Sequence, residues 1–194
     1  SQRISHENLR TRDKRWLEGY ESWFAQRANV SPRPPMFTPF SLRSVTLKNR
    51  VVVSPMAQYS AEDGVAGDYH LVHLGARAMG GAGMVVAEMT CVSSEARITP
   101  GCPGLWNDTQ RDAWKKIVDW VHANSEAKIA LQLGHAGAKG STRLAWDGID
   151  KPLDAANWPL LSASPQQYLQ GESQTSRAMT RADMLCVRDE FVYA

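Results

Sequence analysis

Three short apolar segments, each followed by residues of helical periodicity, constrain the fold more than any other feature of this sequence. The apolar segments are Arg50–Ser54, Met84–Ala87 and Lys128–Leu133. Alternation of strands with crossover helices predicts an α/β protein with a parallel sheet. The continuous apolar character of Arg50–Ser54 also predicts a strand buried on both faces. A doubly wound sheet and a β/α barrel both begin in this way, so periodicity alone leaves the two folds open.

The helices and a first hairpin are delimited by ordinary local signals. We expect helices over residues 69–79, from 108 or 109 to about 124, and from about 180 onward, the first of them ended by Gly80-Gly81. Thr180-Arg-Ala-Asp183 resembles a capping box. The apolar face of that last helix is formed by Met184, Val187, Phe191 and Val192. Two β-prone pieces, Phe40–Leu42 and Val45–Leu47, flank a two-residue turn and predict a hairpin.

The first 30 residues predict a separate amphipathic helix. Ser5 is a plausible N-cap of a helix over residues 5–29. Its stripe of mostly large side chains is Leu9, Trp16, Tyr20, Trp23, Phe24 and Arg27, and so many aromatic side chains require a partner surface. Three prolines within residues 31–35 stop the helix and predict an extended linker.

Composition excludes several classes of function. The 194 residues carry 22 basic and 20 acidic side chains, a net charge of +2 that matches neither a nucleic-acid-binding nor a membrane-surface protein. No apolar run approaches the roughly 20 residues that span a bilayer. Cys91, Cys102 and Cys186 are widely spaced, which argues against a disulfide framework and favours a reducing, cytoplasmic location.

Several catalytic motifs are missing from the sequence. No G-x-G-x-x-G or P-loop pattern follows the first apolar segment, and Gly80–Gly83 lies between a helix and a strand, the wrong order for a dinucleotide site. His70 and His73 stand three apart on a predicted helix, but no third ligand accompanies them, so we expect no metal. A capped, hydrogen-bonded helix start explains these histidines better.

Polar residues follow each of the three predicted strands. They are Ser54–Ser60 after the first strand, Glu88–Thr90 after the second, and Gln132 with Gly134–Lys139 at the third. The carboxyl ends of parallel strands form the active-site rim of α/β proteins. A shared ligand site and the ordinary polarity of loops both explain this pattern, and both remain open.

Several motifs stand in a specific order and spacing: Leu47-Lys-Asn-Arg-Val-Val-Val-Ser-Pro-Met56, Ala87-Glu88, Arg97-Ile-Thr99, Gly104-Leu-Trp-Asn-Asp108 and Leu131-Gln-Leu-Gly-His-Ala-Gly137. In this order and spacing they resemble the Old Yellow Enzyme family of FMN-dependent oxidoreductases. The resemblance implies that residues 36–194 are the N-terminal part of a TIM (β/α)8 barrel with a capping hairpin. It also implies FMN as the cofactor and NADH or NADPH as the reductant.

The resemblance assigns roles to individual residues. Ser54, Pro55, Met56 and Ala57 would line the isoalloxazine edge of FMN, and the backbone of Met89 would contact the flavin. Gln132 would hydrogen-bond the pyrimidine end, where an amide can both donate and accept. Tyr59 would face the substrate pocket as the catalytic candidate. The sequence departs from the family at Ala57, where many relatives carry Cys or Thr, and at Ala138, where they carry Arg.

A second, shorter resemblance concerns residues 1–30. Arg3-Ile-Ser-His-Glu-Asn-Leu-Arg10 and Trp23-Phe24 are similar to the end of a flavin-dependent aromatic-acyl-CoA hydroxylase. In bifunctional anthraniloyl-CoA monooxygenases and salicylyl-CoA 5-hydroxylases such a module precedes an Old Yellow Enzyme-like domain. The resemblance implies a conjugated or dearomatised acyl-CoA as substrate.

Length sets the last expectation. A complete β/α barrel has eight strands and roughly 250 residues, whereas residues 36–194 hold three candidate strands. We therefore expect an incomplete barrel that requires the rest of the barrel as its partner. Two hypotheses follow: the chain is part of a longer bifunctional flavoenzyme, or it is an inactive fragment without independent catalysis.

Overall fold

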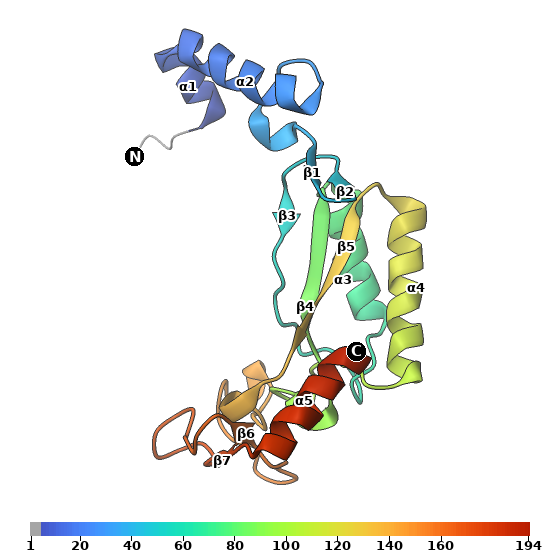
Figure 1. The fold of residues 1–194 in the computed structure, drawn as a ribbon, viewed down its shortest axis with the longest axis vertical. Helices are drawn as coiled ribbons and strands as arrows, with labels where there is room; N and C mark the ends of the chain where they lie inside the picture. Colours follow the sequence, from blue (N-terminus) through green and yellow to red (C-terminus); the bar gives the residue numbers. More distant parts are fainter. Residues whose placement is uncertain (1–4) are drawn as a thin grey trace.

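The structure is a computed structural model that describes residues 5–194. Its helices are α1 (His6–Arg12), α2 (Lys14–Ala28), α3 (Asp68–Met79), α4 (Asp108–Asn124) and α5 (Arg181–Tyr193). Its strands are β1 (Phe40–Leu42), β2 (Val45–Leu47), β3 (Val52–Val53), β4 (Met84–Cys91), β5 (Lys128–Gly134), β6 (Leu161–Ser162) and β7 (Arg177–Ala178). Figure 1 places α1 and α2 at one end of the molecule, the β3–β5 sheet in the middle, and β6, β7 and α5 at the other end.

The central sheet is parallel, with strand order β3-β4-β5, which confirms the predicted α/β class. Helices α3 and α4 pack along one side of it (Figure 1). The core between sheet and helices contains Leu74, Ala78, Val85, Ala87, Trp114, Ile117 and Val121. Val52, Lys128 and Gln132 are exposed, and along their strands they alternate with residues that face this core. The sheet therefore has one covered face and one open face within residues 5–194.

The first strand of this sheet differs from its prediction. Only Val52 and Val53 pair with β4, and the Val52 side chain is 46% exposed, so β3 is not buried on both faces. The reason is its position: β3 is an outer strand that has β4 as its neighbour on one side only, within the described residues. The second strand, in contrast, runs beyond its predicted end at Ala87 and reaches Cys91.

The predicted hairpin forms between β1 and β2, which pair antiparallel with Phe40 opposite Leu47. The chain then enters the sheet through Asn49, whose side chain donates to the Gly81 carbonyl (2.8 Å) and accepts from the Val51 N–H (3.0 Å). Together these two hydrogen bonds connect the start of β3 to the turn before β4. The position of the hairpin as the cap of a closed barrel stays a prediction.

The N-terminal segment contains two helices instead of the one predicted over residues 5–29. Ser5 caps α1 as expected, accepting from the Asn8 N–H (3.2 Å). Asp13 ends α1 and also caps α2, because its carboxylate accepts the Trp16 N–H (2.9 Å). The part of the hydroxylase resemblance that rests on residues 1–4 lies outside the described residues.

The buried face of α2 is not the predicted aromatic stripe. Leu17, Glu21 and Ala25 are its buried side chains, and Glu21 Oε1 is hydrogen-bonded to His6 Nε2 (2.5 Å). Most of the aromatic stripe stays exposed: Trp16 stacks on Tyr20 with ring centroids 5.0 Å apart, and Trp23 is 48% exposed, whereas Phe24 is half-buried next to the Arg50 guanidinium. Helix α1 contacts α2 through His6 and Arg10, which both face Glu21, and Trp16, Tyr20 and Trp23 are left uncovered.

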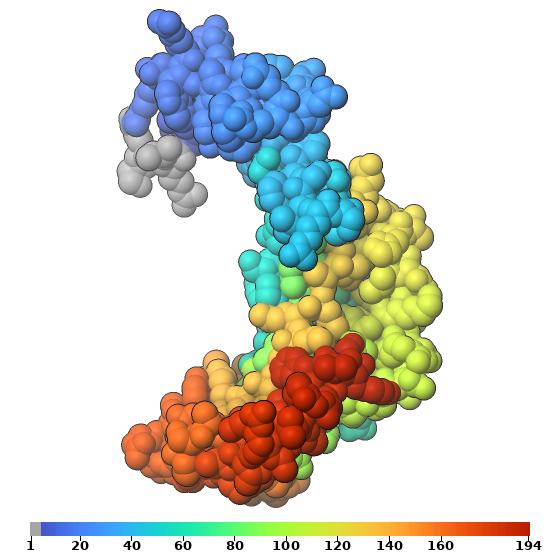
Figure 2. Space-filling model, viewed as in Figure 1, coloured from blue at the N-terminus to red at the C-terminus, as the bar shows by residue number. Residues whose placement is uncertain are grey.

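The C-terminal part combines a confirmed helix with an unpredicted sheet. Thr180 and Asp183 form the predicted capping box of α5, with Asp183 N–H donating to Thr180 Oγ1 (3.2 Å). None of the α5 side chains is buried. Strands β6 and β7 pair in parallel with two residues each, too short for a periodic pattern. In Figure 2 the whole molecule is a crescent, with the N-terminal helices and the C-terminal segments as its two ends.

No helix within residues 5–194 combines the length and the apolar character that crossing a bilayer requires.

Candidate functional site

Most of the predicted flavin-binding residues lie at one end of the sheet. Ser54–Ala57 follow β3, while Met89 on β4 is the register partner of Gln132 on β5. Ser54, Met56, Ala57 and Gln132 are exposed, and Pro55 and Met89 are half-buried. The three strands run in parallel, so their carboxyl ends present these groups on the same edge.

The chemistry of this edge suits a planar ligand with a polar rim, such as FMN. The backbone N–H groups of Met56 and Ala57 make no hydrogen bond within residues 5–194. The exposed Gln132 side chain adds an amide that can donate and accept. Backbone donors and an exposed amide thus lie at the same edge of the sheet.

Tyr59 has an unusual backbone conformation next to this edge. Its φ of 51° lies in the left-handed region, which is uncommon for a residue with a bulky side chain. The backbone carbonyl of Tyr59 faces Gly101 so closely that a β-carbon at residue 101 would lie 2.3 Å from it. Burial raises the pKa of the Tyr59 phenol, and the nearby Cys102 raises it further, so the phenol stays protonated at neutral pH. Strained backbone of this kind is typical of binding sites.

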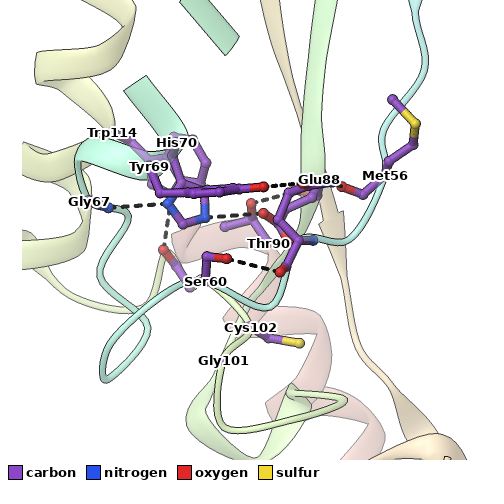
Figure 3. A network of polar contacts seen from close by, with 12 residues as sticks. Met56, Ser60, Gly67, Tyr69, His70, Glu88, Thr90, Gly101, Cys102 and Trp114 are labelled. Carbon is purple, nitrogen blue, oxygen red and sulfur yellow. Dashed lines mark hydrogen bonds and ion pairs between the residues drawn. The ribbon is translucent and has the colours of Figure 1, made fainter. Parts of the chain in front are cut away.

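A buried network that sequence analysis did not assign lies beneath the loop Ser54–Ser60. Figure 3 shows Glu88 and His70 facing each other, with Nε2 and Oε1 3.1 Å apart. The other Glu88 oxygen accepts the backbone N–H of Gln58 (2.8 Å). Both side chains are almost fully buried. A carboxylate inside the β-prone run Met84–Cys91 was the signal that could have found this network, because buried charges need partners.

Two of the free cysteines, Cys91 and Cys102, form a buried thiol pair near the same loop. Cys102 Sγ accepts a hydrogen bond from the Thr99 N–H (3.4 Å), and the Cys91 thiol lies beside it. The neighbouring Cys91 thiol and then the Thr99 N–H lower the pKa of Cys102 to about 7, because they stabilise its thiolate. The same contact, together with burial, raises the pKa of Cys91.

The remaining polar residues of the third strand end have structural partners. His135 Nδ1 accepts the Gly137 N–H (3.0 Å), and burial lowers the pKa of this histidine. Lys139 pairs with Asp150 (2.9 Å) and is therefore not a free cation beside Ala138. As predicted from the cap signal, His70 caps α3: its Nδ1 accepts the Gly67 N–H (3.2 Å). The described residues contain no group of three or more metal-ligating side chains.

Comparison with known proteins identifies the family. A model of the NADH:flavin oxidoreductase / NADH oxidase family matches residues 35–194. The chain belongs to this family. Its relatives include an NADH:flavin oxidoreductase of Gibberella zeae, 37% identical over 82% of this chain and 39% of the relative. An NADPH dehydrogenase of Listeria monocytogenes is 49% identical over 54% of this chain and 31% of the relative.

Solved structures agree with the NADH:flavin oxidoreductase assignment. Morphinone reductase in complex with tetrahydroNAD is 27% identical with a TM-score of 0.66, over 82% of this chain and 44% of that chain. The Old Yellow Enzyme homologue of Zymomonas mobilis, 24% identical with a TM-score of 0.66, supports the fold. The family agrees with the predicted cofactors, FMN and NADH or NADPH. The chain spans about two fifths of the length of the first of these curated relatives.

Proposed function

We propose that this chain is the N-terminal part of an FMN-dependent, ene-reductase-like oxidoreductase within a longer bifunctional flavoenzyme. FMN, when bound, supplies hydride transfer from NADH or NADPH to an activated double bond. The observation that carries the proposal is the grouping of Ser54–Ala57, Met89 and Gln132 at one sheet edge in a chain of this family.

Each residue of the proposed site has a separate task. The N–H groups of Met56 and Ala57 donate to the polar edge of the flavin, and Ser54 and Pro55 shape the loop around it. Gln132 holds the pyrimidine end through its amide, and the backbone of Met89 contacts the ring from the neighbouring strand. Tyr59, protonated at neutral pH, faces the substrate and orients or protonates it.

The substrate class follows from the N-terminal segment. We propose that residues 1–30 are the end of a hydroxylase-like module, that residues 31–35 link it to the barrel, and that the substrate is a conjugated or dearomatised aromatic acyl-CoA. The exposed aromatic face of α2, with Trp16, Tyr20 and Trp23, supports a packing surface for that module. The free, unpaired state of all three cysteines supports a cytoplasmic enzyme.

Titration with FMN tests the proposal. We expect the protein that contains the whole barrel to show a bound-flavin spectrum and to oxidise NADH or NADPH. Gln132→Ala should weaken FMN binding by about tenfold, the loss of roughly one hydrogen bond to a charged or polar ring edge. Asn124→Ala, an exposed amide far from the sheet edge, is the control. A colourless protein after FMN loading, or equal affinity of both variants, contradicts the proposal.

The alternative is that the 194-residue chain alone is an inactive partial barrel. It is favoured by the open face of the sheet and by the outer positions of β3 and β5, which have no further strand beside them in residues 5–194. Purified as it stands and mixed with FMN, the chain should then remain colourless and leave NADH and NADPH unoxidised. Tight flavin binding with turnover by the chain alone excludes this alternative.

A further inference from the structure

We propose that Glu88 and His70 are a positioning pair for the loop Ser54–Ser60: Glu88 holds the backbone of Gln58, and His70 holds Glu88. The inference rests on the proposed function, in which this loop contacts FMN and the substrate. Neither residue is exposed to the site, so both act through Gln58.

A β-bulge places Glu88 under the loop. The register between β4 and β5 shifts between Ala87 and Met89, which makes Glu88 the extra residue of β4. Bulges redirect a side chain and are frequent beside active sites. Here the carboxylate enters the space between the sheet and α3, where 3% of the side chain is exposed. A carboxylate buried so deeply requires hydrogen-bond donors.

His70 faces this carboxylate at ion-pair distance and in a fixed orientation, although the two facing atoms do not have the geometry of a hydrogen bond. Its Nδ1 accepts the Gly67 N–H (3.2 Å), so the ring proton lies on Nε2, which faces Glu88 Oε1 at 3.1 Å. The ring also makes edge contacts with Tyr69 and Trp114, each with centroids 5.9 Å apart. Figure 3 shows this enclosure. The imidazole therefore has little freedom to turn away from Glu88.

Gln58 connects the Glu88–His70 pair to the rest of the loop through hydrogen bonds. Its N–H is held by Glu88, its side-chain N–H donates to the Met56 carbonyl (2.8 Å), and Tyr69 Oη donates to its Oε1 (2.8 Å). Ser60 Oγ donates to the Gln58 carbonyl (3.0 Å). Gln58 thus joins the residues before it, which carry the free N–H groups, to Tyr59, whose left-handed backbone needs support from its surroundings.

Stability alone is a weak reason for such a pair. Burying a polar or charged pair contributes little net stability, and well-packed apolar side chains of similar volume often serve as well. The pair is instead valuable where the position of a particular backbone N–H matters. Because Nδ1 of His70 faces Gly67 and Nε2 faces Glu88, substitutions can test the two ring nitrogens separately.

Two substitutions separate the tasks of the ring nitrogens. His70→Gln reaches the Nε2 position and keeps an N–H group facing Glu88, whereas His70→Asn offers an acceptor near the Nδ1 position for Gly67 only. We expect His70→Asn to speed hydrogen exchange of the Gln58 N–H and to weaken FMN binding, each by about tenfold, a change that equals 1.4 kcal/mol. His70→Gln should leave both within about threefold of wild type.

Hydrogen exchange is measured on the full 194-residue chain and its variants. FMN affinity and flavin midpoint potential are measured on the protein that contains the whole barrel, with the same substitutions. Glu88→Gln, which keeps an acceptor for Gln58, should shift the potential but retain slow exchange. Glu126→Gln, a matched change at an 84% exposed carboxylate, is the control.

Equal FMN affinity and equal Gln58 exchange in the two His70 variants would overturn the proposal and leave the pair a purely structural element. Should a variant fail to fold, the Glu88→Gln exchange rate decides in its place: fast exchange contradicts the proposal. Absence of FMN binding by the wild type contradicts the proposed function, while exchange at Gln58 still decides whether the pair holds the loop.

Discussion

Gly134 and Met89 are packed so tightly across β4 and β5 that a β-carbon at residue 134 would lie 2.4 Å from Met89 Cγ and 2.7 Å from its Sδ. Gly134 thereby allows the Met89 side chain to lie against the end of β5. Met89 is in turn the register partner of Gln132, so the contact lies beside two predicted flavin-binding residues.

Gly134→Ala should therefore destabilise the chain. We expect a loss of about 1–3 kcal/mol, the usual effect of overpacking, in the free energy of unfolding measured with urea. Gly19→Ala is the control: nothing lies within 4 Å of a β-carbon there, and the residue is inside α2. It should gain roughly 0.5–1 kcal/mol from reduced backbone entropy. Equal effects of the two variants contradict the predicted clash.

The thiol pair predicts a specific pH dependence of stability. Native Cys102 loses its proton near pH 7, whereas a thiol in the unfolded chain loses it near 9.0. Between these values the native chain binds fewer protons than the unfolded chain, so stability rises with pH. This contribution is absent below about pH 7 and complete above about pH 9. Above that range the raised pKa of Cys91 acts in the opposite direction and lowers stability.

Unfolding curves at a series of pH values measure this effect. Cys102→Ser should remove the rise of stability with pH. Cys91→Ala should move this rise to higher pH, because Cys102 then loses the neighbour that lowers its pKa most. Cys186→Ser changes an exposed thiol on α5 and should leave the profile unaltered. A rise that persists in Cys102→Ser would assign it to another group.

Arg50 joins the N-terminal helices to the hairpin. Its guanidinium lies 5.0 Å from the ring centroid of Phe24 and 4.9 Å from that of Phe40, and its Nε donates to Thr38 Oγ1 (3.0 Å). Arg50→Lys keeps the charge but loses the planar group, so we expect a loss of about 1–2 kcal/mol from the two ring contacts. Faster protease cleavage within residues 30–34 should accompany it. Arg111→Lys on the exposed face of α4 is the control, and equal cleavage rates would show that Arg50 does not hold the two parts together.

Tyr59→Phe tests the catalytic candidate. In the protein with the whole barrel, loss of the protonated phenol should slow substrate reduction by about a hundredfold, the size of a typical acid-base contribution. FMN affinity should not change, and stability should stay within about 0.5 kcal/mol. Tyr168→Phe, which removes a hydroxyl that contacts Lys139, serves as the comparison. An unchanged reduction rate would place Tyr59 outside the chemistry and leave it a residue of the loop.

Local sequence signals predicted the elements well where the signal itself is local. Ser5, Gly80-Gly81 and Thr180 mark helix ends that the structure confirms, since a cap is a contact between residues three or four apart. The motifs from Leu47 to Met56 and from Leu131 to Gly137 indicate the family by their order and spacing alone. The two-residue strands β6 and β7 were missed because so short a pairing has no period.

By itself the sequence determined the order of the three sheet strands with α3, α4 and α5, the caps at Ser5 and Thr180, the parallel sheet and the family. Tertiary structure alone decided that the buried face of α2 is Leu17, Glu21 and Ala25 instead of its aromatic stripe, and that Glu88 meets His70 beneath Gln58. The physical reason is distance along the chain. Spacing within an element reports which face is apolar, but the partner of that face, or of a buried charge, is set by packing between segments that the sequence does not connect.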